Sequence, residues 1–167
     1  CGSTGESATL TPEEHIRVVR HVVEVASGRV PVVAGTGSNS TREAIELTAA
    51  ARSAGADGAL LISPYYNKPT QEGIYQHYRM VALEGGLPIV LYNIPGRTAS
   101  RIESATPARL SRVPGVAGLK ECGGDFAATA ETIQSVAPGF AVLSGDDPLT
   151  LPLLSIGASG VISTVSN

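Results

Sequence analysis

One lysine stands at the end of a short apolar run, and its position is the chain's strongest indication of chemistry. Lys120 follows Val116-Ala117-Gly118-Leu119 and precedes two glycines. If the run is a strand, Gly118 and Lys120 share one face, and we expect Gly118 to leave space beneath the ammonium group. A desolvated amine loses its proton more readily, and a neutral amine can attack a carbonyl to form a Schiff base. The plain alternative is a strand-end lysine that reaches into solvent, as most lysines do.

A tyrosine ends another apolar run and is the expected partner of that lysine. Tyr92 follows Pro88-Ile89-Val90-Leu91 and points to the face opposite Leu91. In a barrel it would lie inside, on the strand next to that of Lys120, where a phenol can shuttle protons during imine formation. Tyr66 and Ser3 are candidate members of a proton relay. The alternative is a buried tyrosine whose hydroxyl is simply hydrogen-bonded.

Three further polar positions carry weaker signals. Arg97 lies among turn residues, and its guanidinium fork suits a carboxylate, although it could equally be a solvated surface residue. Cys122 falls two residues after Lys120 and is interpreted as a small filler on the same side. Asp146-Asp147 has no histidine near it in the sequence, which favours a turn or a helix cap and predicts no metal site.

The elements that must position these residues alternate along the chain. Short apolar runs predict parallel strands, and they cover 30–33, 59–62, 88–91, 116–119, 140–143 and 160–162. Between them, capping signals predict one helix that begins at Pro12 and a second that begins after Ser40. Helical periodicity predicts four more helices, at 71–83, 106–112, 126–136 and 148–155. Such an order indicates a parallel sheet covered by helices.

Two architectures have that order, an open doubly wound sheet and a (β/α)₈ TIM barrel. Polar clusters follow nearly every strand, whereas an open sheet concentrates its chemistry at one switch point, so the pattern favours the barrel. Six predicted strands of this alternating pattern are visible, and they are preceded by the tail of a further strand that ends at Cys1. Residues 1–167 are therefore expected to form a single partial barrel domain.

Composition excludes several classes of protein. Net charge is −3, the basic residues are dispersed, and aromatic residues make up 4%, which argues against nucleic-acid binding. No apolar stretch approaches the about 20 residues of a membrane span. Two cysteines are too few for a disulfide framework, so we expect a cytoplasmic location.

Five motifs together are similar to those of the dihydrodipicolinate synthase family of pyruvate-dependent class I aldolases. They are Gly2-Ser3-Thr4-Gly5-Glu6-Ser7, Tyr65-Tyr66-Asn67, Tyr92 to Thr98, Gly118-Leu119-Lys120-Glu121 and Ser144-Gly145-Asp146-Asp147. The resemblance implies a (β/α)₈ barrel, usually in a homotetramer. It also implies that this chain runs from the end of strand 2 through strand 8, without the first strand and the C-terminal helical region.

The resemblance further implies the condensation of pyruvate with L-aspartate 4-semialdehyde in lysine and diaminopimelate biosynthesis, with no cofactor beyond a covalent Schiff base at Lys120. Tyr92 would transfer protons through Ser3 to Tyr66, which would reach in from a neighbouring subunit. Thr4, Arg97 and Ile162 would bind the substrates.

Other functions stay open at this level. Gly-Ser-Thr-Gly-Glu, at residues 2–6, is also similar to sialic-acid lyases of the same superfamily, which makes a pyruvate lyase acting on N-acetylneuraminate or a sugar-derived 2-keto acid the second enzyme hypothesis. A non-catalytic barrel remnant that binds keto acids is the third. The resemblance also implies a lysine-effector site, at Ser7, Ala8, His15, Asn39, Glu43 and Tyr65, although Glu43 could instead complete a capping box with Ser40.

Overall fold

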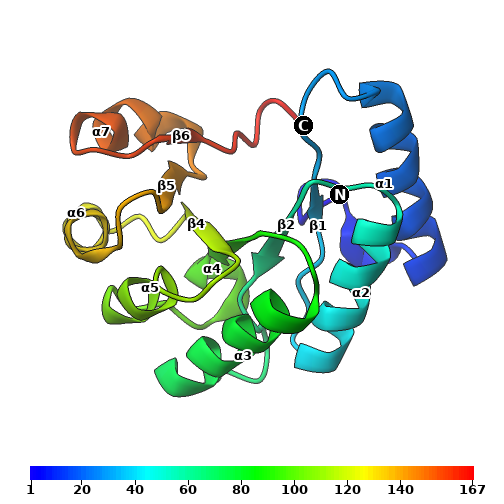
Figure 1. The fold of residues 1–167 in the computed structure, drawn as a ribbon. Helices are drawn as coiled ribbons and strands as arrows, with labels where there is room; N and C mark the ends of the chain where they lie inside the picture. The colour runs from blue at the N-terminus through cyan, green and yellow to red at the C-terminus, as the bar shows by residue number, and fades with distance from the viewer.

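The computed structural model describes all residues 1–167, and its centre is one sheet of six parallel strands. The strands pair strictly in chain order, and they are β1 (Val33–Gly35), β2 (Gly58–Ile62), β3 (Ile89–Asn93), β4 (Val116–Glu121), β5 (Ala141–Ser144) and β6 (Gly160–Val161). Figure 1 shows the sheet curling, with helices around its outer side. An open doubly wound sheet would reverse its strand order, so this topology confirms a partial (β/α)₈ barrel.

The helices follow the strands in alternation, as predicted. They are α1 (Pro12–Ala26), α2 (Thr41–Ser53), α3 (Gln71–Glu84), α4 (Pro95–Thr98), α5 (Ala105–Leu110), α6 (Phe126–Ser135) and α7 (Thr150–Ser155), with two 3-10 turns, η1 (Ser7–Thr9) and η2 (Asp147–Leu149). The turn η1 and the short helix α4 carry no periodic apolar pattern and were not predicted.

The two predicted capping signals have different outcomes. At α1 the capping box is complete, because Glu14 N donates to Thr11 Oγ1 and Thr11 N donates to Glu14 Oε2. At α2 the Glu43 N–H donates to Ser40 Oγ at 3.4 Å, but the Glu43 carboxylate accepts a hydrogen bond from the Ser38 hydroxyl instead. The second box is therefore half formed, and Glu43 is turned toward Ser38.

The first strand begins later than predicted. The apolar run 30–33 predicted a strand, but the ladder covers Val33–Gly35. Pro31 has no N–H to donate to a ladder, and Val32 N instead donates to the Asp57 carboxylate at 2.8 Å. The other strands start within one residue of the prediction.

The core lies between the sheet and its outer helices. Leu61, Leu91 and Leu119 alternate outward along their strands and pack against Ile74 and Tyr78 of α3, and all five side chains are almost fully buried. Burying such an apolar side chain stabilises the fold by about 1.5–3 kcal/mol. Because side chains alternate along a strand, the next residues, Tyr92 and Lys120 among them, point to the inner face.

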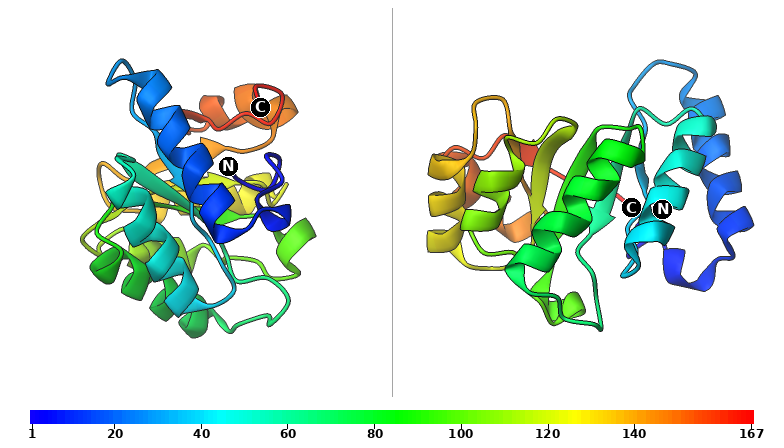
Figure 2. Two further views of the ribbon diagram at one scale, coloured as in Figure 1. Left: turned by 90° about the vertical axis from the view of Figure 1, so that its right-hand side faces the viewer. Right: turned by 60° about the horizontal axis from the view of Figure 1, so that its bottom comes forward.

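The curled sheet leaves β1 and β6 as edge strands, each paired on one side. The two ends of the chain lie near one another in every view (Figures 1 and 2). None of the helices is both long and apolar enough to cross a membrane.

Candidate active site

Lys120 and Tyr92 lie side by side on the inner face of the sheet. The register of β3 and β4 pairs these two residues directly. Lys120 is 6% exposed, Tyr92 is 7% exposed, and Lys120 Nζ lies 4.3 Å from the centroid of the Tyr92 ring. A cation over an aromatic face is stabilised by the ring quadrupole. The predicted neighbourhood of these two side chains is therefore confirmed.

The space around the lysine has a different origin from the one predicted. A Cβ at Gly118 would lie 2.5 Å from the Ala141 carbonyl oxygen, so Gly118 permits close approach of β5 and leaves no room beneath the ammonium group. Gly145, which follows β5, does make room: a Cβ there would lie 2.6 Å from Lys120 Cε and would also collide with Cys122 Sγ. Cys122 thus lies on the lysine side, as predicted.

Burial keeps the polar groups of this cluster protonated. Burial raises the pKa of the Tyr92 phenol, the neighbouring Cys122 acts in the same direction, and Arg97 acts weakly against both. Burial likewise raises the pKa of the Cys122 thiol to about 11. At neutral pH the site therefore holds a protonated phenol, able to donate a proton, beside an amine.

Ser3 is brought to Tyr92 by the chain's first turn. Glu6 N donates to the Ser3 carbonyl and Ser7 N to the Gly2 carbonyl, both at 3.2 Å, and the Cys1 carbonyl contacts Gly35 of β1. A cavity of about 40 Å³ lies between this turn and the sheet, with Ser3 and Tyr92 in its wall. Thr4 is exposed and lines neither this cavity nor the larger one beside it.

The larger cavity, of about 470 Å³, joins Arg97 to most of the predicted effector residues. Its wall includes Ser3, Ser7, Ala8, His15, Glu43, Tyr65 and Arg97. His15 Nε2 is buried without a hydrogen-bond partner, and burial lowers the pKa of His15. Asn39 lies outside this wall, and its carbonyl accepts a hydrogen bond from Asn67 Nδ2.

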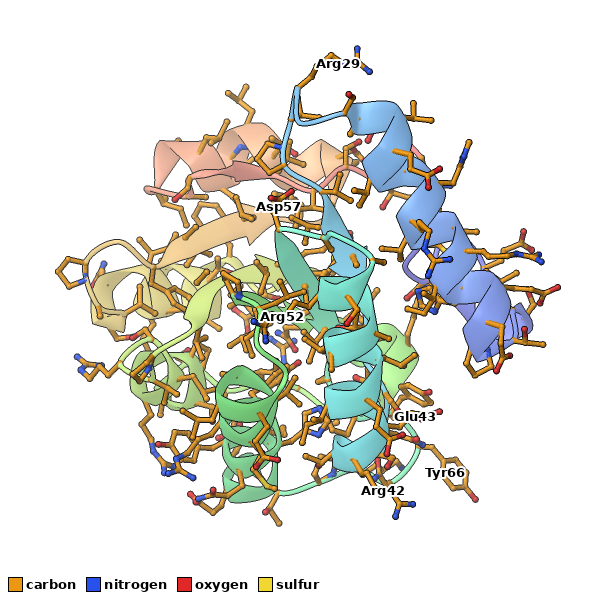
Figure 3. The ribbon with its side chains drawn as sticks, turned by 45° about the vertical axis from the view of Figure 1, so that its right-hand side comes forward. Arg29, Arg42, Glu43, Arg52, Asp57 and Tyr66 are labelled. Carbon is orange, nitrogen blue, oxygen red and sulfur yellow. The ribbon has the colours of Figure 1, made fainter.

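Tyr66 is not brought to the site within one chain. Its side chain is 88% exposed and projects away from the ribbon (Figure 3). Its φ of +72° is unusual for an aromatic residue. Ile162 is half-buried just after β6, where its N–H donates to the Ser144 carbonyl at 2.8 Å.

Asp147 has the structural role that the sequence favoured. It opens η2, and its carboxylate accepts hydrogen bonds from the Ser163 hydroxyl and from Thr164 N, which holds the segment after β6. No group of three or more His, Cys, Asp or Glu side chains is arranged to hold a metal ion.

Sequence reasoning missed the roles of Asn93, Glu121 and Gly145. Asn93 and Glu121 appeared only as polar strand ends, and their mutual hydrogen bonds become visible once the β3–β4 register is known. The signal for Gly145 was its place directly after a strand, beside the strand of Lys120.

The fold and the buried lysine–tyrosine pair on its inner face give this chain the architecture of a partial (β/α)₈ barrel. The chain belongs to the dihydrodipicolinate synthetase family, because the sequence model of that family matches residues 1–167. It is 56% identical over 168 residues to the 4-hydroxy-tetrahydrodipicolinate synthase of Oleidesulfovibrio alaskensis, and the match covers 100% of this chain and 58% of that protein.

Two solved structures show the same likeness. The chloride-inhibited dihydrodipicolinate synthase of Acinetobacter baumannii, complexed with pyruvate, is 49% identical, with a TM-score of 0.96 over 99% of this chain and 57% of that one. The synthase of Cyanidioschyzon merolae with lysine bound is 47% identical, with a TM-score of 0.93 over 99% and 56%. The chain thus spans somewhat more than half the length of these relatives.

Proposed function

We propose that the protein is a 4-hydroxy-tetrahydrodipicolinate synthase, a lyase that condenses pyruvate with L-aspartate 4-semialdehyde. The observation that carries the proposal is the buried Lys120 amine, which lies 4.3 Å from the centroid of the buried Tyr92 ring. The named relatives and the pyruvate complex of the Acinetobacter protein support it.

The chemistry follows from an amine beside a proton donor. The Lys120 amine attacks the keto carbon of pyruvate, and the resulting carbinolamine loses its hydroxyl as water when Tyr92 supplies a proton. The C=N bond draws electrons from the pyruvate methyl group, which loses a proton to give an enamine. The enamine carbon then attacks the aldehyde carbon of the second substrate, whose oxygen takes up a proton. The amino group of that substrate adds to the imine carbon and displaces the Lys120 amine, which closes the ring and releases the product.

The surrounding residues take the remaining roles. Ser3 shares a cavity wall with Tyr92 and extends the proton path, and Tyr66, which points outward here, completes it in a neighbouring subunit. Thr4 and the Ile162 carbonyl bind pyruvate, and Arg97 binds the carboxylate of the semialdehyde. The proposal includes a homotetramer in the cytoplasm and no cofactor beyond the covalent imine.

A comparison of substrates tests the reaction class. The full-length protein should condense pyruvate with aspartate semialdehyde and should not cleave N-acetylneuraminate. Cleavage of N-acetylneuraminate without condensation would assign the protein to the lyases, whose Gly-Ser-Thr-Gly-Glu turn it shares. Failure with both substrates would favour a barrel that only binds keto acids.

We also propose that lysine binds in the 470 Å³ cavity and inhibits the enzyme. Glu43 is one of its wall residues, and its carboxylate is engaged with Ser38 rather than with the start of its own helix, so it can pair with a ligand ammonium group. The lysine complex of the Cyanidioschyzon relative supports this proposal.

Titration of the full-length protein with L-lysine checks the effector site. We expect inhibition in the wild type, its loss in Glu43→Ala, and its persistence in Glu46→Ala, an exposed position one turn further along α2. Inhibition that survives Glu43→Ala would place the site elsewhere, and no inhibition at millimolar lysine would reject it.

A further inference from the structure

Asn93 and Glu121 form a buried amide–carboxylate pair at the ends of β3 and β4. Asn93 Nδ2 donates to Glu121 Oε1 at 2.9 Å and to Oε2 at 3.0 Å, and the two residues are 1% and 8% exposed. They are paired in the register directly after Tyr92 and Lys120. Since side chains alternate along a strand, the pair lies on the opposite face of the sheet, behind the proposed reacting groups.

The same two residues hold the chain segments that leave both strands. Asn93 Oδ1 accepts a hydrogen bond from Ile102 N at 3.0 Å, and the Asn93 carbonyl accepts one from Cys122 N at 2.8 Å. The Glu121 carboxylate also accepts a hydrogen bond from Gly123 N. The turn that carries Cys122 beneath Lys120 is therefore tied to Asn93 and Glu121.

Arg101 adds a second connection between the same two segments. Its guanidinium donates to the Gly123 carbonyl at 3.1 Å and lies 3.6 Å from the Asp125 carboxylate. Arg101 precedes Ile102, so the segment after β3 and the turn after β4 are joined at two neighbouring points.

Hydrogen bonds hold this pair in place next to a cavity. The cavity, of about 320 Å³, has Asn93 and Glu121 in its wall together with residues of α5 and α6. Burial raises the pKa of Glu121, whereas the Asn93 amide and the Gly123 N–H act in the opposite direction. The Glu121 carboxylate accepts hydrogen bonds from Asn93 Nδ2 and Gly123 N, which suits an acceptor-only group.

We propose that Asn93 and Glu121 are positioning residues that set the spacing of Lys120 and Tyr92. The inference rests on the proposed Schiff-base function. Neither side chain reaches the reacting atoms, but each fixes the backbone of its strand one residue beyond them. A small displacement of a reacting group is enough to slow an enzyme about 100-fold.

An exchange of amide and carboxylate tests this role. Glu121→Gln replaces one of the two acceptors of Asn93 Nδ2 by a donor, and Asn93→Asp places an acceptor opposite the Glu121 acceptor, so the first variant weakens the pair and the second breaks it. The double variant restores it: the new amide can accept from Gly123 N and donate to the new carboxylate, whose other oxygen can accept from Ile102 N. Thr48→Val is the matched control, because it removes another buried hydrogen bond, between the Thr48 and Thr36 hydroxyls at 2.8 Å.

The measurements are the rate at which pyruvate and borohydride modify the full-length protein, kcat, KM and Tm. We expect each single variant to lower kcat and the trapping rate about 10- to 100-fold with little change in KM. The double variant should recover to within about threefold of the wild type, while Thr48→Val lowers Tm and keeps the trapping rate.

Four results would overturn the inference. Single variants with wild-type rates would show that the pair does not position the site. Slow single variants without recovery in the double variant, or a similar slowing in Thr48→Val, would reduce the pair to general stability. If one single variant does not fold, the trapping rate and kcat of the double variant are compared with those of the single variant that does fold. A wild type that is not trapped at all would overturn the proposed function itself, and the positioning role with it.

Discussion

At the scale of single residues, the site depends on keeping an amine and a phenol away from water and close together. Lys120 and Tyr92 are both buried, and burial raises the pKa of the phenol. Their adjacency could be predicted because alternation along two neighbouring strands puts both on one face. The role of Gly145 could not, because it depends on how closely the loop after β5 approaches Lys120.

Replacement of Tyr92 by phenylalanine tests the phenol as proton donor. The ring would still cover Lys120 Nζ, so we expect an unchanged Tm and a kcat at least about 100-fold lower. Steady-state kinetics with both substrates measure the effect. A kcat within a few-fold of the wild type would show that another group moves the proton.

Gly145→Ala tests the space beside the lysine. The added methyl group would collide with Cys122 Sγ and lie 2.6 Å from Lys120 Cε, so Lys120 must move. We expect kcat to fall at least about tenfold. Gly160→Ala is the control, because its methyl group would meet a Leu143 methyl at an ordinary 3.4 Å. Equal activity in both variants would contradict the account of this space.

At the scale of the elements, short sequence motifs predicted a helix start that depends only on neighbouring residues. The α1 capping box was predictable from Thr11 and Glu14, and it is complete. The start of β1 was not, because the apolar run continues through Pro31 while the ladder begins at Val33. The hydrogen bond between the Glu43 carboxylate and the Ser38 hydroxyl could not be predicted either, because it depends on the conformation of the loop before α2.

The packing of α2 against α3 predicts an acid-sensitive contact. His77 Nδ1 lies 2.9 Å from Thr41 Oγ1, His77 Nε2 is buried without a partner, and burial lowers the pKa of His77 to about 4. The unfolded chain, with a histidine pKa of about 6.5, takes up the proton first. This contribution to stability is therefore full above about pH 6.5 and is lost as the pH falls toward 4.

Urea unfolding of the wild type and His77→Gln at several pH values measures that contribution. Between pH 6.5 and 4, the free energy of unfolding should fall further in the wild type than in His77→Gln, with a difference on the order of 3 kcal/mol. Other buried groups such as His15 are common to both proteins and cancel in the difference. Parallel pH curves would show that His77 is hydrated in the folded state.

At the scale of the whole molecule, strand order was predictable from the alternation of elements, and it places the polar strand ends on one rim. The outward direction of the Tyr66 side chain did not follow from local sequence patterns, and only the family resemblance implied it (Figure 3). The role of Tyr66 in a neighbouring subunit stays a proposal.

Mixed oligomers test whether Tyr66 acts across subunits. Tyr66→Phe lacks the donated phenol and Lys120→Ala lacks the amine, so each protein alone should be weakly active or inactive. Subunits exchanged between the two should regain activity, because sites with an intact Lys120 then receive Tyr66 from the other subunit. A mixture no more active than its components would confine Tyr66 to its own chain.

The most direct test of the central claim is to trap the imine. Borohydride reduces an imine to a stable secondary amine, and the chain contains two lysines, Lys68 and Lys120, of which Lys68 is exposed. After treatment of the full-length protein with pyruvate and borohydride, peptide mass mapping should place the reduced pyruvate adduct on Lys120, with Lys68 unmodified. Modification of Lys68 alone, or of neither lysine, would contradict the account.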